Sequence, residues 1–140
     1  MRTYYLFCIK DEIYDITKNS PKDLYCSFER IYKMNKNDIN IGYNIYKRIA
    51  NQINKPKINR LITSINENNI NYTCFNYNHV INNFYNNENT KLTIYNSYIV
   101  IKTNASIPSF FKDFNTINNL FVIDFNNEDY FYLKKALVNV

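Results

Sequence analysis

The sequence predicts a single small α+β domain over residues 1–140, with a mixed β-sheet packed against several helices. Of the 140 residues 46% are apolar, including 14 Tyr and 10 Phe, which is enough to fill the core of one domain. Runs of branched and aromatic residues near both ends favour strands, while the apolar residues between them recur at helical spacing. No internal repeat and no long linker divides the chain.

The first third of the chain favours one strand and two helices. Residues 3–9 are almost all aromatic or branched and stop at a charged cluster, as a buried strand does. Residues 11–17 then favour a short helix. A longer helix is expected from Ser20 to about Tyr32, with Ser20 as its N-cap and Pro21 at the first helical position.

Two further helices are expected in the middle of the chain. Residues 38–53 carry an i, i+4 stripe that predicts an amphipathic helix with this stripe inward: Ile41, Ile45, Ile49 and Ile53. Pro56 begins another helix, whose apolar residues recur at i, i+3, i+4 and i+7: Ile58, Leu61, Ile62 and Ile65. Residues 66–90 are dense in Asn and stay unassigned, apart from one strand indicated by the alternation of Ile70, Tyr72 and Cys74.

The last third favours a hairpin, a helix and a second buried strand. The hairpin is expected to turn at Asn96-Ser97, because Asn tolerates the positive φ of a tight turn. Ser106 is the expected cap of the helix, and Asp124 follows the second strand. The ranges are residues 91–95 and 98–103 for the hairpin strands, 106–114 for the helix, 120–123 for the second strand and 130–133 for a tail that packs back on the sheet.

Composition excludes several functional classes. Gly42 is the single glycine, so neither a P-loop nor the Gly-rich dinucleotide fingerprint can be built. His79 is the single histidine, which excludes a zinc site that needs two. The three cysteines lack C-x-x-C spacing and indicate reduced, mostly buried thiols: Cys8, Cys26 and Cys74. No cofactor and no small-molecule substrate is predicted.

The chain also lacks the signals that direct a protein to a membrane. The apolar run at residues 4–9 is too short for a signal peptide and is followed at once by Lys and two acids. No segment approaches the roughly 18 consecutive apolar residues that a membrane-spanning helix needs. A cytoplasmic protein is therefore expected.

Two groups of residues are candidates for catalysis or metal binding. Cys74 and His79 offer a thiol and a base, but Cys74 is expected in a strand and His79 in an Asn-rich loop, with no acid to orient the imidazole. Asp11, Glu12 and Asp15 could bind a metal, although the macrodipole also favours acids in the first turn of a helix. Neither group makes a catalytic constellation, so no enzyme is predicted.

Positive charge is concentrated in residues 30–60. This segment holds eight Lys and Arg against one acid, Asp38, and so carries a net +7 in a chain whose total is +5. Such a region can bind nucleic acid or an acidic protein, or be a solvated face. Only three of the eight are Arg, in a loose spread. Direct nucleic-acid binding stays an alternative, through Lys47, Arg48, Lys55, Lys57 and Arg60.

Two segments of the chain resemble a known family. Residues 4–12, Tyr-Tyr-Leu-Phe-Cys-Ile-Lys-Asp-Glu, resemble the N-terminal strand and turn of the SirA family, the sporulation inhibitor of replication proteins of spore-forming Firmicutes. Residues 120–130 resemble the family's closing signature, an apolar strand followed by Asp-Phe-Asn, a small polar residue, Glu and then Tyr. Residues 49–61, with Pro56, fall where the family has a Pro-containing helix junction. The resemblance covers about residues 4–133.

This resemblance implies a small α/β protein that is not an enzyme. SirA-like proteins bind the N-terminal domain of the replication initiator DnaA and restrain new rounds of replication at the start of sporulation. The family's contacting surface is made by its first two helical segments and uses aromatic residues, where this chain has Thr17 at one such position. By position, the implied protein-binding residues are Ile13, Tyr14, Ile16 and Thr17 in the first segment and Tyr43, Asn44, Tyr46, Lys47 and Arg48 in the second.

The residues themselves are compatible with such a surface. Residues 11–17 form too short a segment to bury every apolar side chain, so Ile13 or Ile16 is expected at the surface. The helix over residues 38–53, with its Ile stripe inward, turns Lys47 and Arg48 outward. An apolar anchor beside a basic rim is a reasonable protein-binding surface. The alternative is that both isoleucines are ordinary core residues.

Overall fold

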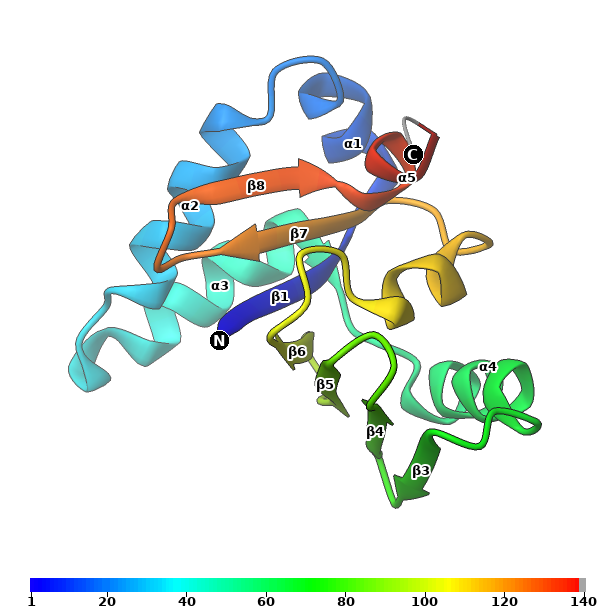
Figure 1. The fold of residues 1–140 in the computed structure, drawn as a ribbon. Helices are drawn as coiled ribbons and strands as arrows, with labels where there is room; N and C mark the ends of the chain where they lie inside the picture. The colour runs from blue at the N-terminus through cyan, green and yellow to red at the C-terminus, as the bar shows by residue number, and fades with distance from the viewer. Residues whose placement is uncertain (139–140) are drawn as a thin grey trace.

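An antiparallel sheet forms the centre of the molecule. The computed structural model describes residues 1–138. The strands are β1 (Arg2–Ile9), β2 (Ala50–Asn51), β3 (Tyr72–Phe75), β4 (Asn78–Asn83), β5 (Glu88–Ile94), β6 (Ile99–Thr103), β7 (Leu120–Asp124) and β8 (Asp129–Tyr132). Their order is β3-β4-β5-β6-β1-β7-β8, and β2 pairs with the end of β1 (Figure 1). The first strand of the chain therefore lies inside the sheet.

Helices connect and cover these strands. They are α1 (Asp11–Thr17), α2 (Lys22–Tyr32), α3 (Ile39–Ile49), α4 (Lys55–Asn66) and α5 (Leu133–Val138), with two 3₁₀ helices, η1 (Lys36–Asp38) and η2 (Ser109–Phe114). None of the helices within residues 1–138 is both long and apolar enough to span a membrane. The predicted α+β class is confirmed. The expected mixed sheet was wrong, because every strand pair in this part of the chain is antiparallel. Short hairpin connections require this only for the pairs β3–β4, β4–β5, β5–β6 and β7–β8.

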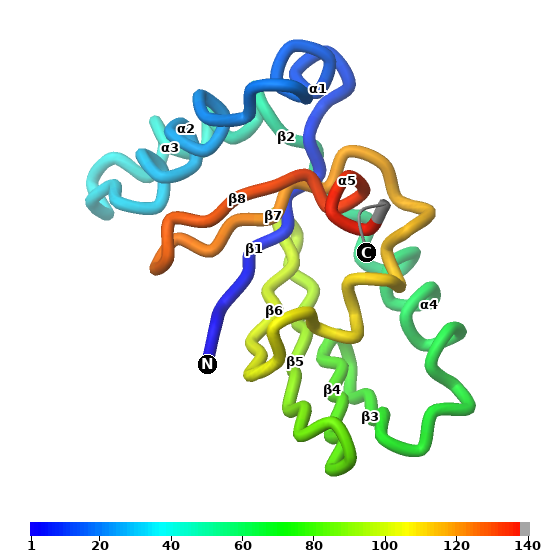
Figure 2. Tube along the Cα trace, turned by 45° about the horizontal axis from the view of Figure 1, so that its top comes forward, coloured from blue at the N-terminus to red at the C-terminus, as the bar shows by residue number. Residues whose placement is uncertain are grey.

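Helices lie on both faces of the sheet where β1 and β7 run (Figure 2). Side chains alternate along a strand, so Leu6 joins a core cluster with α4 and η2, whereas its neighbour Phe7 joins a second cluster with α2 and α3. Towards β5 only the first cluster continues: Leu92 is buried in it, while Lys91 on the opposite face is exposed. Helices α1 to α3 thus cover one face, and α4 and η2 the other.

The predicted elements agree with the structure near both ends of the chain. The strand at residues 3–9, the short helix at 11–17 and the helix ending at Tyr32 correspond to β1, α1 and α2. The hairpin strands correspond to β5 and β6, the second buried strand to β7, and the tail to β8 followed by α5. These segments combine a clear hydrophobic pattern with strong local signals.

The helix expected over residues 38–53 is shorter than predicted and buries a different face. Gly42 and Tyr46 are its buried residues, whereas Ile41, predicted to point inward, is 52% exposed. Ile53 lies outside the helix, because the chain turns at Ala50 into β2. Helix α3 buries this face because it packs closely on α2, and the glycine on this face allows the close approach.

Two predicted helix caps were also wrong. Helix α2 begins at Lys22, one residue later than expected, so Pro21 rather than Ser20 is its N-cap, and no side chain accepts a capping hydrogen bond there. The helix expected at residues 106–114, with Ser106 as its cap, is the shorter η2, whose N-cap is Pro108. A residue remote in sequence binds the start of η2. The carboxylate of Glu88 accepts a hydrogen bond from the Ser109 backbone N–H at 3.0 Å and another from the Ser109 hydroxyl.

The Asn-rich segment holds more structure than its sequence indicates. One strand was expected around residues 70–74; β3 confirms it, and β4 follows directly. Positive φ angles at Asn76 (54°) and Asn87 (51°) allow the turns that flank β4. Asn96, for which positive φ was expected, does not adopt it, and its turn closes through a bond from the Tyr95 N–H to the Tyr98 carbonyl, 3.0 Å.

Candidate protein-binding surface

Helix α1 presents an apolar side chain to solvent. It follows β1 directly and begins with two acids, Asp11 and Glu12, in its first turn. None of its residues is fully buried. Ile13 and Tyr14 are half-buried against the core cluster that α2 and α3 share, whereas Ile16 is 74% exposed. Of the two isoleucines, Ile16 is therefore the one that is free to meet a partner.

Thr17 is tied to the sheet rather than presented outward. Its hydroxyl lies 2.7 Å from the Ile13 carbonyl, to which it donates, and 2.6 Å from the hydroxyl of Tyr132 on β8. The Tyr14 ring packs edge-on against the same tyrosine, with 4.9 Å between the ring centroids. These contacts fix the outer turn of α1 on the sheet, which holds Ile16 in a defined position.

The two tyrosines of helix α3 lie on different sides of the helix, one buried and one exposed. Tyr46 is buried, and its hydroxyl lies 3.0 Å from each of two backbone carbonyls, those of Asn51 and Ser97. Burial raises the pKa of Tyr46, so the hydroxyl remains a neutral donor. Tyr43 is 45% exposed and lies beneath the amine of Lys47, 4.9 Å from the ring centroid. Tyr43, but not Tyr46, is thus available to a partner.

The outer side of α3 carries the remaining implied residues. Asn44, Lys47 and Arg48 are all exposed, and the two basic residues lie in the last turn, where the macrodipole favours cations. Ile41 is exposed on the same helix. The sequence did not predict that Ile41 is exposed. The signal that could have shown it is that α3 carries more apolar residues than one buried stripe can hold, so some must face solvent.

The two helices meet at one end. The backbone N–H of Lys10, just before α1, donates to the carbonyl of Ile49, the last residue of α3, at 3.0 Å. Lys47 and Arg48 therefore lie within one helical turn of the start of α1, and Ile16 lies about 9 Å of helix rise beyond Lys10. We call the exposed residues of this region the α1–α3 face: Ile16, Tyr43, Asn44, Lys47 and Arg48.

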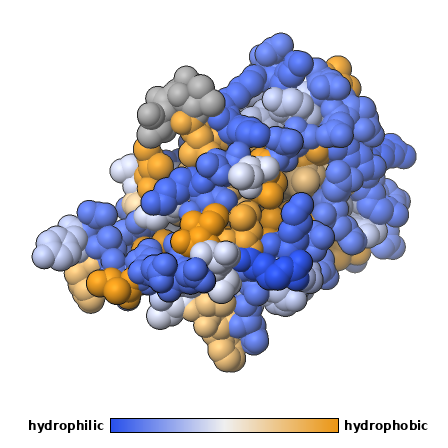
Figure 3. All heavy atoms as spheres, turned by 90° about the vertical axis from the view of Figure 1, so that its right-hand side faces the viewer, coloured by the Kyte–Doolittle hydropathy of each residue, from blue (hydrophilic) through white to orange (hydrophobic). Residues whose placement is uncertain are grey.

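The basic segment is divided between two faces of the sheet. Lys47 and Arg48 lie on α3, but Lys57 and Arg60 lie on α4, across the sheet. Lys55 is half-buried, with its amine 4.3 Å from the centroid of the Tyr77 ring. On the α4 side, hydrophilic residues cover most of the surface, and apolar residues gather near its middle (Figure 3). The segment therefore does not form one continuous basic patch.

His79 is a structural residue of the sheet. It lies in β4, not in a loop as expected, and its side chain is fully buried. One ring nitrogen lies 2.6 Å from the Tyr72 hydroxyl, and the other lies 2.7 Å from the Asn59 amide oxygen. Burial lowers the pKa of His79 to about 4. Cys74 is its cross-strand neighbour and makes no hydrogen bond with the imidazole nitrogens, which are both occupied. The expectation of mostly buried thiols was wrong, because Cys74 and Cys26 are exposed and Cys8 is only half-buried.

The acidic groups also have structural partners. Asp11 accepts a hydrogen bond from the Asn119 side chain at 2.6 Å, and within residues 1–138 no group of His, Cys, Asp and Glu is arranged to hold a metal. Asp124 is buried and accepts from Arg2 at 2.8 Å and from Asn127. Burial alone would raise the pKa of Asp124, but these hydrogen bonds from Asn127 and Arg2 hold it below its ordinary value.

Comparison with known proteins identifies a family. The model of a family described as sporulation inhibitor of replication protein SirA matches residues 2–136, nearly the whole chain. A search for similar proteins of curated function found no match. The match includes β1, the helices of the α1–α3 face, and the β7–β8 turn that Asp124 holds. The chain belongs to the SirA family of sporulation-linked inhibitors of replication.

Proposed function

We propose that this protein is a non-enzymatic regulator that binds the N-terminal domain of the initiator DnaA through the α1–α3 face. By occupying that domain in the cytoplasm it would restrain new rounds of replication at the onset of sporulation. The observations that carry the proposal are that Ile16 is exposed on α1 and that, on α3, exposed Tyr43 lies beneath the amine of Lys47, next to exposed Arg48.

The chemistry of this face suits a protein partner. An exposed apolar side chain can enter a pocket and lose contact with water, while basic residues at the rim favour an acidic surface and speed encounter. The single histidine of the chain is engaged on both nitrogens and so offers no free imidazole for catalysis. We expect the partner to present an apolar pocket flanked by carboxylates.

A calorimetric titration against the isolated DnaA N-terminal domain tests the proposal. Ile16→Asp is the sharpest variant, because Ile16 is exposed, whereas Ile13 packs against the core and its replacement would also affect folding. We expect the wild-type protein to bind near one-to-one. Ile16→Asp should weaken binding by at least about tenfold, as loss of an apolar anchor does. The matched control is Ile70→Asp, at an isoleucine that is 96% exposed outside this face.

Charge reversal provides the second arm of this experiment. The double variant Lys47→Glu, Arg48→Glu should weaken binding, and the loss should shrink as salt is added. The matched double variant Lys57→Glu, Arg60→Glu, on α4, should bind as the wild type does. No binding by the wild-type protein would contradict the proposal. Equal losses from the two double variants would contradict the assigned face.

A further inference from the structure

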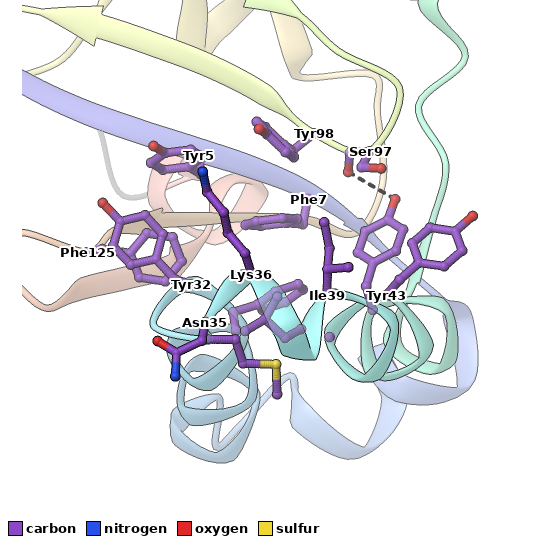
Figure 4. Close-up of a pocket in the computed structure, with 15 residues that line it drawn as sticks. Tyr5, Phe7, Tyr32, Asn35, Lys36, Ile39, Tyr43, Ser97, Tyr98 and Phe125 are labelled. Carbon is purple, nitrogen blue, oxygen red and sulfur yellow. Dashed lines mark hydrogen bonds between the residues drawn. The ribbon is translucent and has the colours of Figure 1, made fainter.

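A pocket of about 520 Å³ opens between the α2–α3 hairpin and the face of the sheet that these helices cover. Sites for small molecules commonly have volumes of about 300–1,000 Å³. Tyr5 and Phe7 of β1 form its inner wall, and η1 closes one side (Figure 4). Large apolar side chains at its rim stay exposed, since Ile39 is 70% and Tyr32 51% accessible.

Aromatic rings make up one end of this pocket. Tyr32 and Phe125 are stacked with 4.1 Å between their centroids, and Tyr5 meets Phe125 at 5.4 Å in an edge-to-face arrangement. Tyr98 continues the group, 5.5 Å from Tyr5. Rings in these geometries bind further rings through stacking and edge contacts. The walls therefore favour a flat aromatic body over a flexible chain.

One charge lines the pocket, and it is positive. Lys36 extends from η1 into the pocket towards β1 (Figure 4). No carboxylate lines the pocket, and Lys36 makes no ion pair within residues 1–138. Burial raises the pKa of Tyr5 and of Tyr98, so these phenols stay neutral at physiological pH. The Lys36 amine would attract an anionic group placed beside it, and no carboxylate of the pocket lining would repel that group.

We propose that this pocket binds a small aromatic molecule with one anionic group, its rings among Tyr5, Tyr32 and Phe125 and its anion at Lys36. Such a ligand would cover the apolar rim that water now contacts. The pocket shares only Tyr43 with the α1–α3 face. The proposal therefore does not depend on the proposed function, and each can fail without the other.

Two fluorescent probes that differ by one charge test this site in the full chain. 8-Anilinonaphthalene-1-sulfonate carries a sulfonate, and N-phenyl-1-naphthylamine has the same rings without it. We expect the sulfonate to bind saturably, one per chain, and about fivefold more tightly than the neutral probe, as one partly exposed ion pair provides. Lys36→Gln should abolish this preference, and Lys57→Gln, on the opposite side of the sheet, should preserve it.

A second variant tests the ring wall separately from the charge. Tyr32→Ala should weaken both probes to a similar extent, and circular dichroism should confirm that the variant is folded, since half of the Tyr32 surface is already exposed. Equal affinity of the wild type for the two probes would overturn the proposal. So would non-saturable binding, or a preference for the sulfonate that survives Lys36→Gln.

Discussion

At the residue scale, Tyr43 and Tyr46 show how one helix exposes one tyrosine to solvent and buries another in the core. They lie three positions apart in α3, yet Tyr43 is exposed beneath the Lys47 amine. Tyr46 is buried, and its hydroxyl lies within hydrogen-bond distance of two backbone carbonyls. The resemblance to the family assigned both to partner binding. Of the two, only Tyr43 is exposed in the structure, whereas Tyr46 joins α3 to the turn between β5 and β6.

The variant Tyr46→Phe tests this division. Removing the hydroxyl leaves the carbonyls of Asn51 and Ser97 without their donor, so we expect the free energy of unfolding to fall by about 1–2 kcal/mol. Tyr43→Phe is the matched control and should change it by less than about 0.5 kcal/mol. Urea denaturation measures both, and equal midpoints for the two variants would contradict the assignment.

At the scale of elements, the contact between α2 and α3 depends on the only glycine. A Cβ at Gly42 would lie 3.1 Å from the Met34 sulfur and 3.5 Å from a methyl group of Ile31. The thioether is flexible and half-buried at the pocket, so it can shift by a few tenths of an ångström. The composition showed only that Gly42 cannot form a phosphate cradle; its packing role depends on Ile31 of α2 and on Met34, which follows that helix.

Substitutions at Gly42 should therefore follow side-chain size. Gly42→Ala should raise the free energy of unfolding by up to about 1 kcal/mol, because alanine favours the helix and Met34 can yield. Gly42→Val should lower it by about 1–3 kcal/mol, because its branched side chain pushes α3 away from α2. Thermal denaturation of the two variants provides the comparison, and a valine variant as stable as the alanine variant would contradict this account of the contact.

Elements were predictable where their signals are local. β1, α2 and β7 carry their own hydrophobic pattern, so the sequence determines them without reference to the rest of the chain. The start of η2 was not predictable, because its backbone is bound by Glu88, 21 residues away. β4 was missed because Asn and His surround its only two apolar residues, Val80 and Ile81, and its burial depends on packing against α4, as the hydrogen bond between His79 and Asn59 illustrates.

At the scale of the whole molecule, the candidate surface could be located only once the fold was known. The sequence located the basic charge in residues 30–60 but not its division between two faces of the sheet, which follows from the path of the chain through β2. It also left open which isoleucine of residues 11–17 is exposed. The structure resolves this through packing, since Ile13 lies against the shared core and Ile16 does not.

The buried imidazole links stability to pH. His79 has a pKa of about 4 in the folded protein and 6.5 ordinarily, so the unfolded chain binds more protons between these values. Stability should be highest above pH 6.5 and fall by up to about 3 kcal/mol as the pH drops towards 4. In His79→Gln this loss should be absent, although the variant starts from a lower stability. Parallel pH profiles for the two proteins would contradict the assigned role.

Backbone amide exchange in the complex with the DnaA N-terminal domain tests whether the α1–α3 face is the binding surface. Binding should slow exchange in residues 11–17 and 39–49, while residues 55–66 of α4 and the strands β3 to β5 should exchange as they do in the free protein. Slower exchange centred on α4, or none in α1 and α3 at saturating partner, would contradict it.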